Sequence, residues 1–108
     1  MSLFAQYLME RTDTSIIETE EGFITFKPWP NGMYIEDLFV NKDHRFNGAA
    51  SRLADQVAVI AKEQGFKSLF GSICPAAKGS TEGMKVLLAY GFKLDSSANN
   101  FIVFKKDL

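Results

Sequence analysis

One segment, residues 34–73, restricts the possible folds more than any other part of this sequence. It contains two runs of β-branched and aromatic residues, at 34–40 and 68–73, which predict strands. Between them, from Ala49 to Gln64, apolar residues recur at the spacing of one buried helix face. These residues are Ala50, Leu53, Ala54, Val57, Ala58 and Ala61. A helix that connects two strands packs back on the sheet, so the segment predicts a sheet with this helix on its face.

The N-terminal part adds a helix and a hairpin before this unit. Over residues 2–11 the apolar positions recur at intervals of three and four, which predicts a short amphipathic helix. Strands are predicted at 16–19 and 23–27, and Pro-Trp-Pro-Asn-Gly at 28–32 predicts a tight turn. Trp29 in this turn is either a binding platform or a cap folded over the end of the hairpin, and we favour the cap.

The C-terminal part adds a second helix and a second hairpin. The helix is predicted over 81–90, with Ser80 or Thr81 as its N-cap. The last strands are predicted near 92–94 and 101–105, with a long turn between them. The complete order of elements predicts an α/β (α+β) fold, in which a mixed, mostly antiparallel twisted sheet carries helices on its faces.

Length and charge narrow the class of protein. The chain has 108 residues, 46% hydrophobic and 23% charged, which predicts one domain over 1–108. Its formal net charge of -1 does not favour a nucleic-acid partner. No stretch resembles a signal peptide or a membrane span of about 20 apolar residues. The single cysteine, Cys74, fits a reducing compartment, so we expect a cytoplasmic protein without a membrane partner.

Few residues are suited to metal or nucleophilic chemistry. One cysteine and one histidine exclude a Cys/His metal site, and no metal is expected, although an all-carboxylate site stays open. His44 is either a solvated loop residue or a catalytic one, and we favour the first. Cys74 is either a small core residue or a nucleophile, and we favour the core because no histidine follows at a recognisable spacing.

The loop before the helix at 49–64 carries a stronger chemical signal. Gly48 and the small residues after it begin a helix, where unpaired backbone N–H groups and a partial positive charge attract anions such as phosphate. Arg45 adds a cation suited to phosphate. Small residues at a helix start also serve packing, so the loop by itself leaves both interpretations open.

Three motifs in register resemble the GNAT superfamily of N-acetyltransferases. The sequence V-N-K-D-H-R-F-N-G-A-A-S at 40–51 resembles that family's acyl-CoA pyrophosphate loop, Arg/Gln-x-x-Gly-x-Gly/Ala. Y-I-E-D-L-F-V at 34–40 looks like the preceding strand of diamine and polyamine acetyltransferases, and A-Y-G-F at 89–92 is similar to the end of the family's final helix. The resemblance implies a compact GNAT-like fold and a single acetyltransferase domain of EC 2.3.1 type with acetyl-CoA as co-substrate.

The resemblance also implies which residues contact the co-substrate. Backbone groups of Leu38, Phe39 and Val40 would meet the pantetheine arm and the acetyl carbonyl. Ser80 falls where the family often has an asparagine that contacts the arm. The residues implied by the pyrophosphate loop are Arg45, Phe46, Asn47, Gly48, Ala49, Ala50 and Ser51.

The acid and base of the family's reaction are not equally represented. The tyrosine that often protonates the leaving thiolate is replaced by Leu87, and Tyr90 lies three residues further on. A thiol with a pKa near ~8.5 leaves readily without a general acid. An alkylammonium with a pKa of ~10.4, in contrast, costs about 4.6 kcal/mol to deprotonate at pH 7. We therefore expect a carboxylate base to be retained.

Glu36 and Asp37 are the candidates for that base. Two adjacent acids are unusual among the apolar residues of a strand. Because side chains alternate along a strand, at most one should face a given site unless a bulge intervenes. The resemblance to diamine acetyltransferases favours Glu36 as the base, acting through water. Asp37 would then hold a cationic substrate or brace a loop.

These inferences predict direct acetyl transfer from acetyl-CoA to a primary amine of a small cationic molecule. Two alternatives stay open: an enzyme acting on protein lysines or N-termini, and a non-catalytic acyl-CoA-binding interaction module. Family members usually carry about two helices before or among the early strands, whereas only 2–11 is predicted to be helical here. We therefore expect an open acceptor site, completed by a second subunit of a possible homodimer or by the substrate itself.

Overall fold

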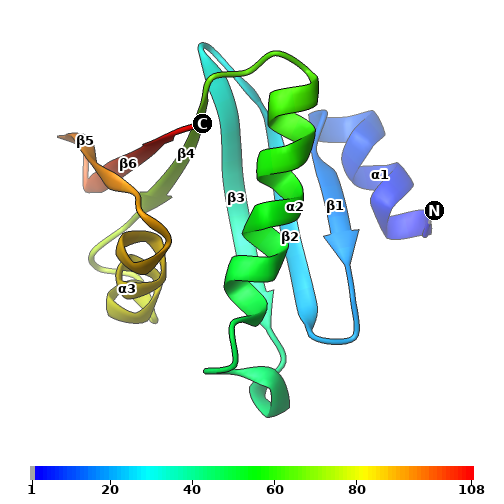
Figure 1. Cartoon of the computed structure of the whole chain (residues 1–108), viewed down its shortest axis with the longest axis horizontal. Coiled ribbons are helices and arrows are strands. Elements are labelled where there is room, and N and C mark those ends of the chain that lie inside the picture. The colour runs from blue at the N-terminus through cyan, green and yellow to red at the C-terminus, as the bar shows by residue number, and fades with distance from the viewer. Residues whose placement is uncertain (1) are drawn as a thin grey trace.

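The computed structural model describes residues 2–108, which form a six-stranded sheet and three α-helices (Figure 1). The strand order is β1-β2-β3-β4-β6-β5; β3 and β4 pair in parallel and the other neighbours are antiparallel. This confirms the predicted mixed, mostly antiparallel sheet. In chain order the elements are α1 (Leu3–Thr12), β1 (Ser15–Glu18), β2 (Gly22–Trp29), β3 (Gly32–Val40), the 3-10 helix η1 (Lys42–His44), α2 (Ala49–Glu63), β4 (Ser68–Ile73), α3 (Ser80–Tyr90), β5 (Lys93–Ala98) and β6 (Phe101–Asp107).

The core lies between α2 and the sheet. Figure 1 shows α2 lying along β2 and β3, and the apolar stripe predicted from sequence faces these strands. Leu53, Val57 and Ala61 of α2 are fully buried against strand residues such as Ile24 and Leu69. Figure 1 places α1 beside β1, away from α2, and no residue of α1 is buried.

The stability of the fold should therefore depend strongly on the buried face of α2. Leu53→Ala removes a side chain that is 1% exposed and leaves a cavity, so the free energy of unfolding should fall by about 2–5 kcal/mol. Urea denaturation measures it. The matched control is Val59→Ala on the same helix, 54% exposed, which should change the free energy of unfolding by less than about 0.5 kcal/mol. Equal losses for the two variants would contradict this packing.

Both predicted hairpin turns are shorter in the structure. β2 extends to Trp29, which pairs with Gly32, so the turn consists of Pro30 and Asn31. The Trp29 ring packs on Tyr34 and Phe70 at centroid distances of 4.8 and 5.2 Å, which is the expected cap. The long turn predicted between the last two strands is wrong. Asn99 and Asn100 both adopt positive φ, which closes the hairpin in two residues and lengthens β5.

The predicted N-cap of α3 is also wrong. The cap is Gly79, at φ 82°, rather than Ser80 or Thr81. The Ser80 hydroxyl instead donates a hydrogen bond to the Pro75 carbonyl at 3.1 Å. A glycine adopts this left-handed conformation without steric cost, so the helix begins one residue earlier than the serine and threonine pattern indicated.

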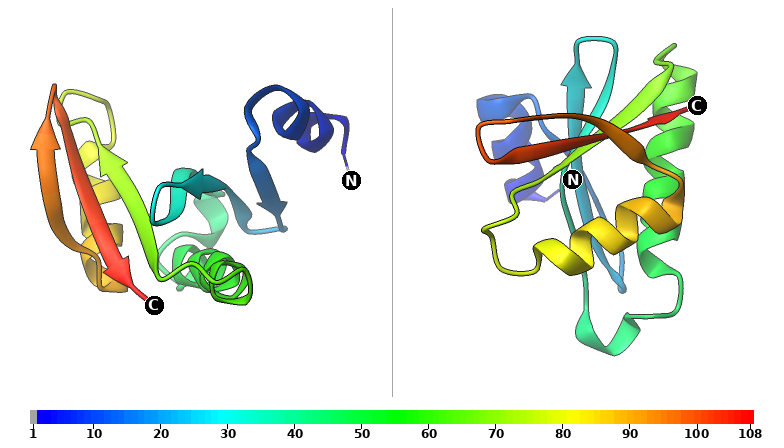
Figure 2. Two further views of the ribbon diagram at one scale, coloured as in Figure 1. Left: turned by 90° about the horizontal axis from the view of Figure 1, so that it is seen from above. Right: turned by 90° about the vertical axis from the view of Figure 1, so that its left-hand side faces the viewer.

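The two halves of the sheet separate at β3 and β4. These strands pair over only three positions, Met33–Ile35 with Leu69–Gly71. Figure 2 shows β1, β2 and β3 as one group of strands, and β4, β6 and β5 as a second group turned away from it. The end of β3 and the end of β4 therefore diverge, with α2 following the first and α3 following the second.

Candidate active site

A cavity of about 240 Å³ lies where β3 and β4 diverge. Its walls come from residues 35–38 of β3, residues 71–73 of β4, and side chains of α2 and α3. Gly71 lets α3 approach β4 closely, since a Cβ there would lie 3.2 Å from the Leu87 side chain. The site predicted from sequence at the end of the strand 34–40 thus coincides with an opening in the sheet.

A β-bulge brings both predicted acids to this cavity. Thr25 of β2 pairs with Asp37 and Phe26 pairs with Ile35, so Glu36 is an extra residue in β3. The Asp37 backbone N–H donates to the Thr25 hydroxyl at 3.0 Å. The bulge interrupts the alternation of side chains, and both Glu36 and Asp37 line the cavity.

Glu36 forms an ion pair that sequence reasoning missed. Its carboxylate lies 2.8 Å from the Lys27 ammonium, on the neighbouring strand β2. The hydrogen bond to Glu36 raises the pKa of Lys27, so the lysine stays charged through the neutral range. Lys27 pairs with Tyr34 in the hairpin, which makes Glu36 its diagonal neighbour. Had the register of the β2–β3 hairpin been known, the sequence would have placed Glu36 next to Lys27.

The first turn of α2 borders the same cavity. Its N-cap is Gly48 at φ 87°, which has no side chain to cap the helix, and Ala50 lines the cavity. The Ala49 N–H donates to Asn47 Oδ1 at 3.3 Å. Gly48 and Ser51 are exposed. The predicted anion-binding turn, through Ala50, and the predicted acids therefore border the same cavity.

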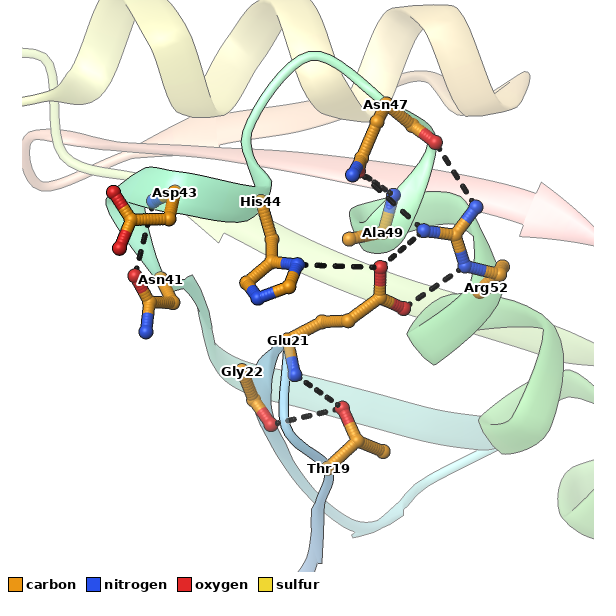
Figure 3. Close-up of polar contacts among 9 residues, drawn as sticks. All are labelled: Thr19, Glu21, Gly22, Asn41, Asp43, His44, Asn47, Ala49 and Arg52. Atoms are coloured by element: carbon orange, nitrogen blue, oxygen red, sulfur yellow. Dashed lines mark hydrogen bonds and ion pairs between the residues drawn. The ribbon is translucent and has the colours of Figure 1, made fainter.

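Two arginines lie beside this turn, and they have different partners. Arg45, the cation singled out from sequence, donates from Nε to the Val40 carbonyl at 3.0 Å and lies over the Phe39 ring. Arg52, which the sequence analysis did not consider, contacts Asn47 and Glu21 (Figure 3). The only sequence signal for Arg52 was a charged residue within the first turn of an otherwise small-residue helix start.

The remaining predicted contacts are distributed along β3 and the loop. Leu38 lines the cavity, whereas Phe39 stacks on Phe23 and is half exposed. Phe46 is fully exposed and has φ 63°. Ser80, at the start of α3, is held by its hydrogen bond to Pro75 and is not among the residues that line the cavity.

Leu87 and Tyr90 of α3 both line the cavity, but the tyrosine hydroxyl has a partner elsewhere. It donates to Asp55 Oδ1 on α2 at 2.5 Å. Burial, followed by this hydrogen bond and the charge of Asp55, raises the pKa of Tyr90 far above its ordinary value. The phenol therefore keeps its proton, and that proton points to Asp55.

Comparison with known proteins supports the same assignment of the fold and gives the family. A family model described as the acetyltransferase (GNAT) family matches residues 4–80, which include β3, the loop and α2. A search of curated sequences finds no significant match. Among 2–108, no helix has the length and apolar character needed to cross a membrane.

Solved structures similar to this chain include several acetyltransferases. The PaiA N-acetyltransferase of Thermoplasma acidophilum in complex with coenzyme A has a TM-score of 0.79 at 16% identity, covering 95% of this chain and 66% of its own. A GNAT acetyltransferase of Elizabethkingia anophelis with acetyl-CoA bound has a TM-score of 0.71 at 20% identity, and the match covers 98% of this chain and 82% of that protein. A putative streptothricin acetyltransferase of Bacillus anthracis in complex with acetyl-CoA has a TM-score of 0.69 at 24% identity, and the match covers 82% of this chain and 56% of that protein.

Proposed function

This chain belongs to the acetyltransferase (GNAT) family, and on that premise we propose that it transfers an acetyl group from acetyl-CoA to a primary amine of a small cationic molecule. One observation carries the proposal: Glu36 and Asp37 line the same cavity as Ala50, which lies in the first turn of α2, so the candidate base and the candidate anion-binding turn border one cavity. The resemblance of residues 34–40 to diamine and polyamine acetyltransferases supports the class of acceptor.

The residues around the cavity fit an acyl-CoA. The start of α2 after Gly48 has no side-chain cap on that glycine, and it offers the backbone N–H groups of Ala50 and Ser51 to a diphosphate, while the Ala49 N–H is held by Asn47 Oδ1. Leu38 to Val40, where β3 has left β4, offer backbone groups to an extended pantetheine arm. Acetyl-CoA would supply an activated thioester at the cavity. The protein would have to orient the two substrates and remove a proton from the acceptor amine.

The two carboxylates have different surroundings, and this supports different roles. Glu36 is oriented by Lys27 and would accept the proton of the incoming amine through water. The Asp37 carboxylate forms no ion pair with any residue of 2–108, so it remains available to bind a second ammonium of the acceptor. A diamine acceptor fits both carboxylates, because its attacking amine would give its proton to Glu36 and its second ammonium would bind Asp37.

Two measurements test the proposal. Acetyl-CoA should raise the thermal unfolding temperature, and thiol should be released from acetyl-CoA in the presence of polyamines in preference to amino acids or peptides. A preference for peptides would instead support an enzyme that acts on protein lysines or N-termini. Stabilisation without thiol release would support an acyl-CoA-binding interaction module, which Leu87 at the usual tyrosine position favours.

Tyr90 should not be the general acid, because its proton is directed to Asp55. Tyr90→Phe should lower kcat for thiol release by less than about threefold, whereas loss of a general acid costs about 10²–10⁴-fold. The control is Tyr7→Phe, an exposed tyrosine of α1. A decrease of 100-fold or more for Tyr90→Phe alone would assign the acid to Tyr90.

The proposal includes a cytoplasmic homodimer. α1 exposes Leu3, Phe4 and Tyr7, with Leu3 82% exposed. We infer that a second copy covers these side chains, and we expect the second subunit to complete the open acceptor site. Analytical ultracentrifugation measures the oligomeric state, and a monomer at all concentrations would contradict this part of the proposal.

A further inference from the structure

The loop before α2 is held by Glu21, a residue from the turn between β1 and β2 (Figure 3). The Glu21 carboxylate accepts two hydrogen bonds from Arg52, one from Nε at 3.0 Å and a short one from Nη2. The two groups thus meet edge to edge, which is the most directional form of an arginine–carboxylate pair.

Arg52 extends this contact into the loop. Its Nη1 donates to the Asn47 carbonyl at 2.9 Å, and Nη2 lies 3.4 Å from Asn47 Oδ1. The same Oδ1 accepts the Ala49 N–H, and a Cβ on Gly48 would lie 3.1 Å from Arg52 Nη1. The guanidinium therefore lies directly against the turn that begins α2.

Glu21 also contacts the other end of the loop. Its backbone carbonyl accepts the Asn41 N–H at 2.6 Å, and the Asn41 carbonyl accepts the His44 N–H at 2.8 Å. The His44 ring lies 4.0 Å from the Glu21 carboxylate. One residue thus fixes both the start of the loop, through its backbone, and the end, through Arg52.

The charges of this pair persist at neutral pH. The hydrogen bond from Arg52 lowers the pKa of Glu21 below its ordinary value of 4.5, and the same contact raises the pKa of Arg52. Exposed ion pairs add little to global stability. Ordering a loop before a ligand arrives, in contrast, reduces the cost of binding, so the contact is better suited to a ligand-binding role.

We propose that Glu21 and Arg52 are positioning residues that hold Gly48 and the first turn of α2 in the conformation that binds the diphosphate of acetyl-CoA. The inference rests on the proposed function. It distinguishes two roles for Arg52: as a positioning residue it needs Glu21, whereas as a direct phosphate ligand it would compete with Glu21 for the same guanidinium.

The test compares Glu21→Gln, Arg52→Gln and the double variant by calorimetric titration with acetyl-CoA. Each single variant should weaken acetyl-CoA binding by about tenfold, and the double variant should be no weaker than either single one, because the two residues act as one unit. The KM for acetyl-CoA should rise while kcat falls by less than about threefold. Glu20→Gln, the same change one residue earlier, is the matched control and should bind like wild type.

Arg52→Lys separates geometry from charge. It keeps the cation but cannot form the two-bond contact, so it should bind as weakly as Arg52→Gln. Restored binding by Arg52→Lys, tighter binding by Glu21→Gln, or additive losses in the double variant would each overturn the positioning role. Failure of wild type and Glu20→Gln to bind acetyl-CoA would contradict the proposed function itself, and the inference with it.

Discussion

Replacing Glu36 with Gln should lower kcat of acetyl transfer by about 10²–10⁴-fold at neutral pH, the usual contribution of a general base. The acceptor amine is an ammonium at pH 7, and deprotonation costs about 4.6 kcal/mol for a pKa of ~10.4. Gln occupies the same volume and still accepts a hydrogen bond from Lys27, but it cannot take a proton. The affinity for acetyl-CoA should change by less than about twofold, because Glu36 is not in the turn at Gly48.

The pH profile should identify the chemical origin of this loss. Without a base, only amine that is already neutral reacts, and its fraction rises tenfold per pH unit up to a pKa of ~10.4. The rate of Glu36→Gln should therefore keep rising with pH where wild type has levelled off, and the optimum should move upward. Initial rates of thiol release between pH 6 and pH 10 measure this difference.

Asp37→Asn is the matched control, since it is the neighbouring acid on the same cavity. It should raise the KM for a diamine acceptor and leave the shape of the pH profile as in wild type. Full activity of Glu36→Gln over the whole pH range would reject Glu36 as the base. If Asp37→Asn, and not Glu36→Gln, moved the optimum upward, the two roles would have to be exchanged.

The sequence was sufficient to predict those parts of the fold that depend on local periodicity. The stripe of α2 and the strand 68–73 needed only the spacing of apolar residues. Gly79 and the pair Asn99–Asn100 were not predicted, because several residues nearby offered equally good turn or cap chemistry. The choice among them depends on where α3 and β6 pack, which is a tertiary effect.

The candidate site was predictable in composition but not in geometry. The pair of acids was visible in the sequence, yet their common direction depends on a bulge that arises between β2 and β3. The contacts of Glu36 with Lys27 and of Arg52 with Glu21 join different elements, and the second joins residues 31 positions apart. Such pairs become visible only when strand register and helix placement are known.

Replacing Gly48 with Glu should weaken acetyl-CoA binding by about 100-fold or more. The side chain would put a negative charge against the helix start that is proposed to bind the diphosphate, where the partial positive charge of α2 now favours an anion. Gly48 is also at φ 87°, a conformation that disfavours any side chain, so part of the loss would come from strain in the loop. Calorimetric titration with acetyl-CoA measures the affinity.

Gly79→Glu separates the effect of a charge at the proposed diphosphate site from the effect of backbone strain. Gly79 is likewise the N-cap of a helix, at φ 82°, and a Cβ there meets nothing within 4 Å. The two substitutions thus place the same charge on a similar left-handed backbone at equivalent positions of α3 and α2, and only the Cβ at position 48 meets a neighbour, Arg52 Nη1 at 3.1 Å. Gly79→Glu should lose thermal stability through the strain of its left-handed backbone, as Gly48→Glu does, but should bind acetyl-CoA like wild type. Equal affinities of the two variants would show that the turn at Gly48 does not hold the diphosphate, because charge and strain alone would then explain the change.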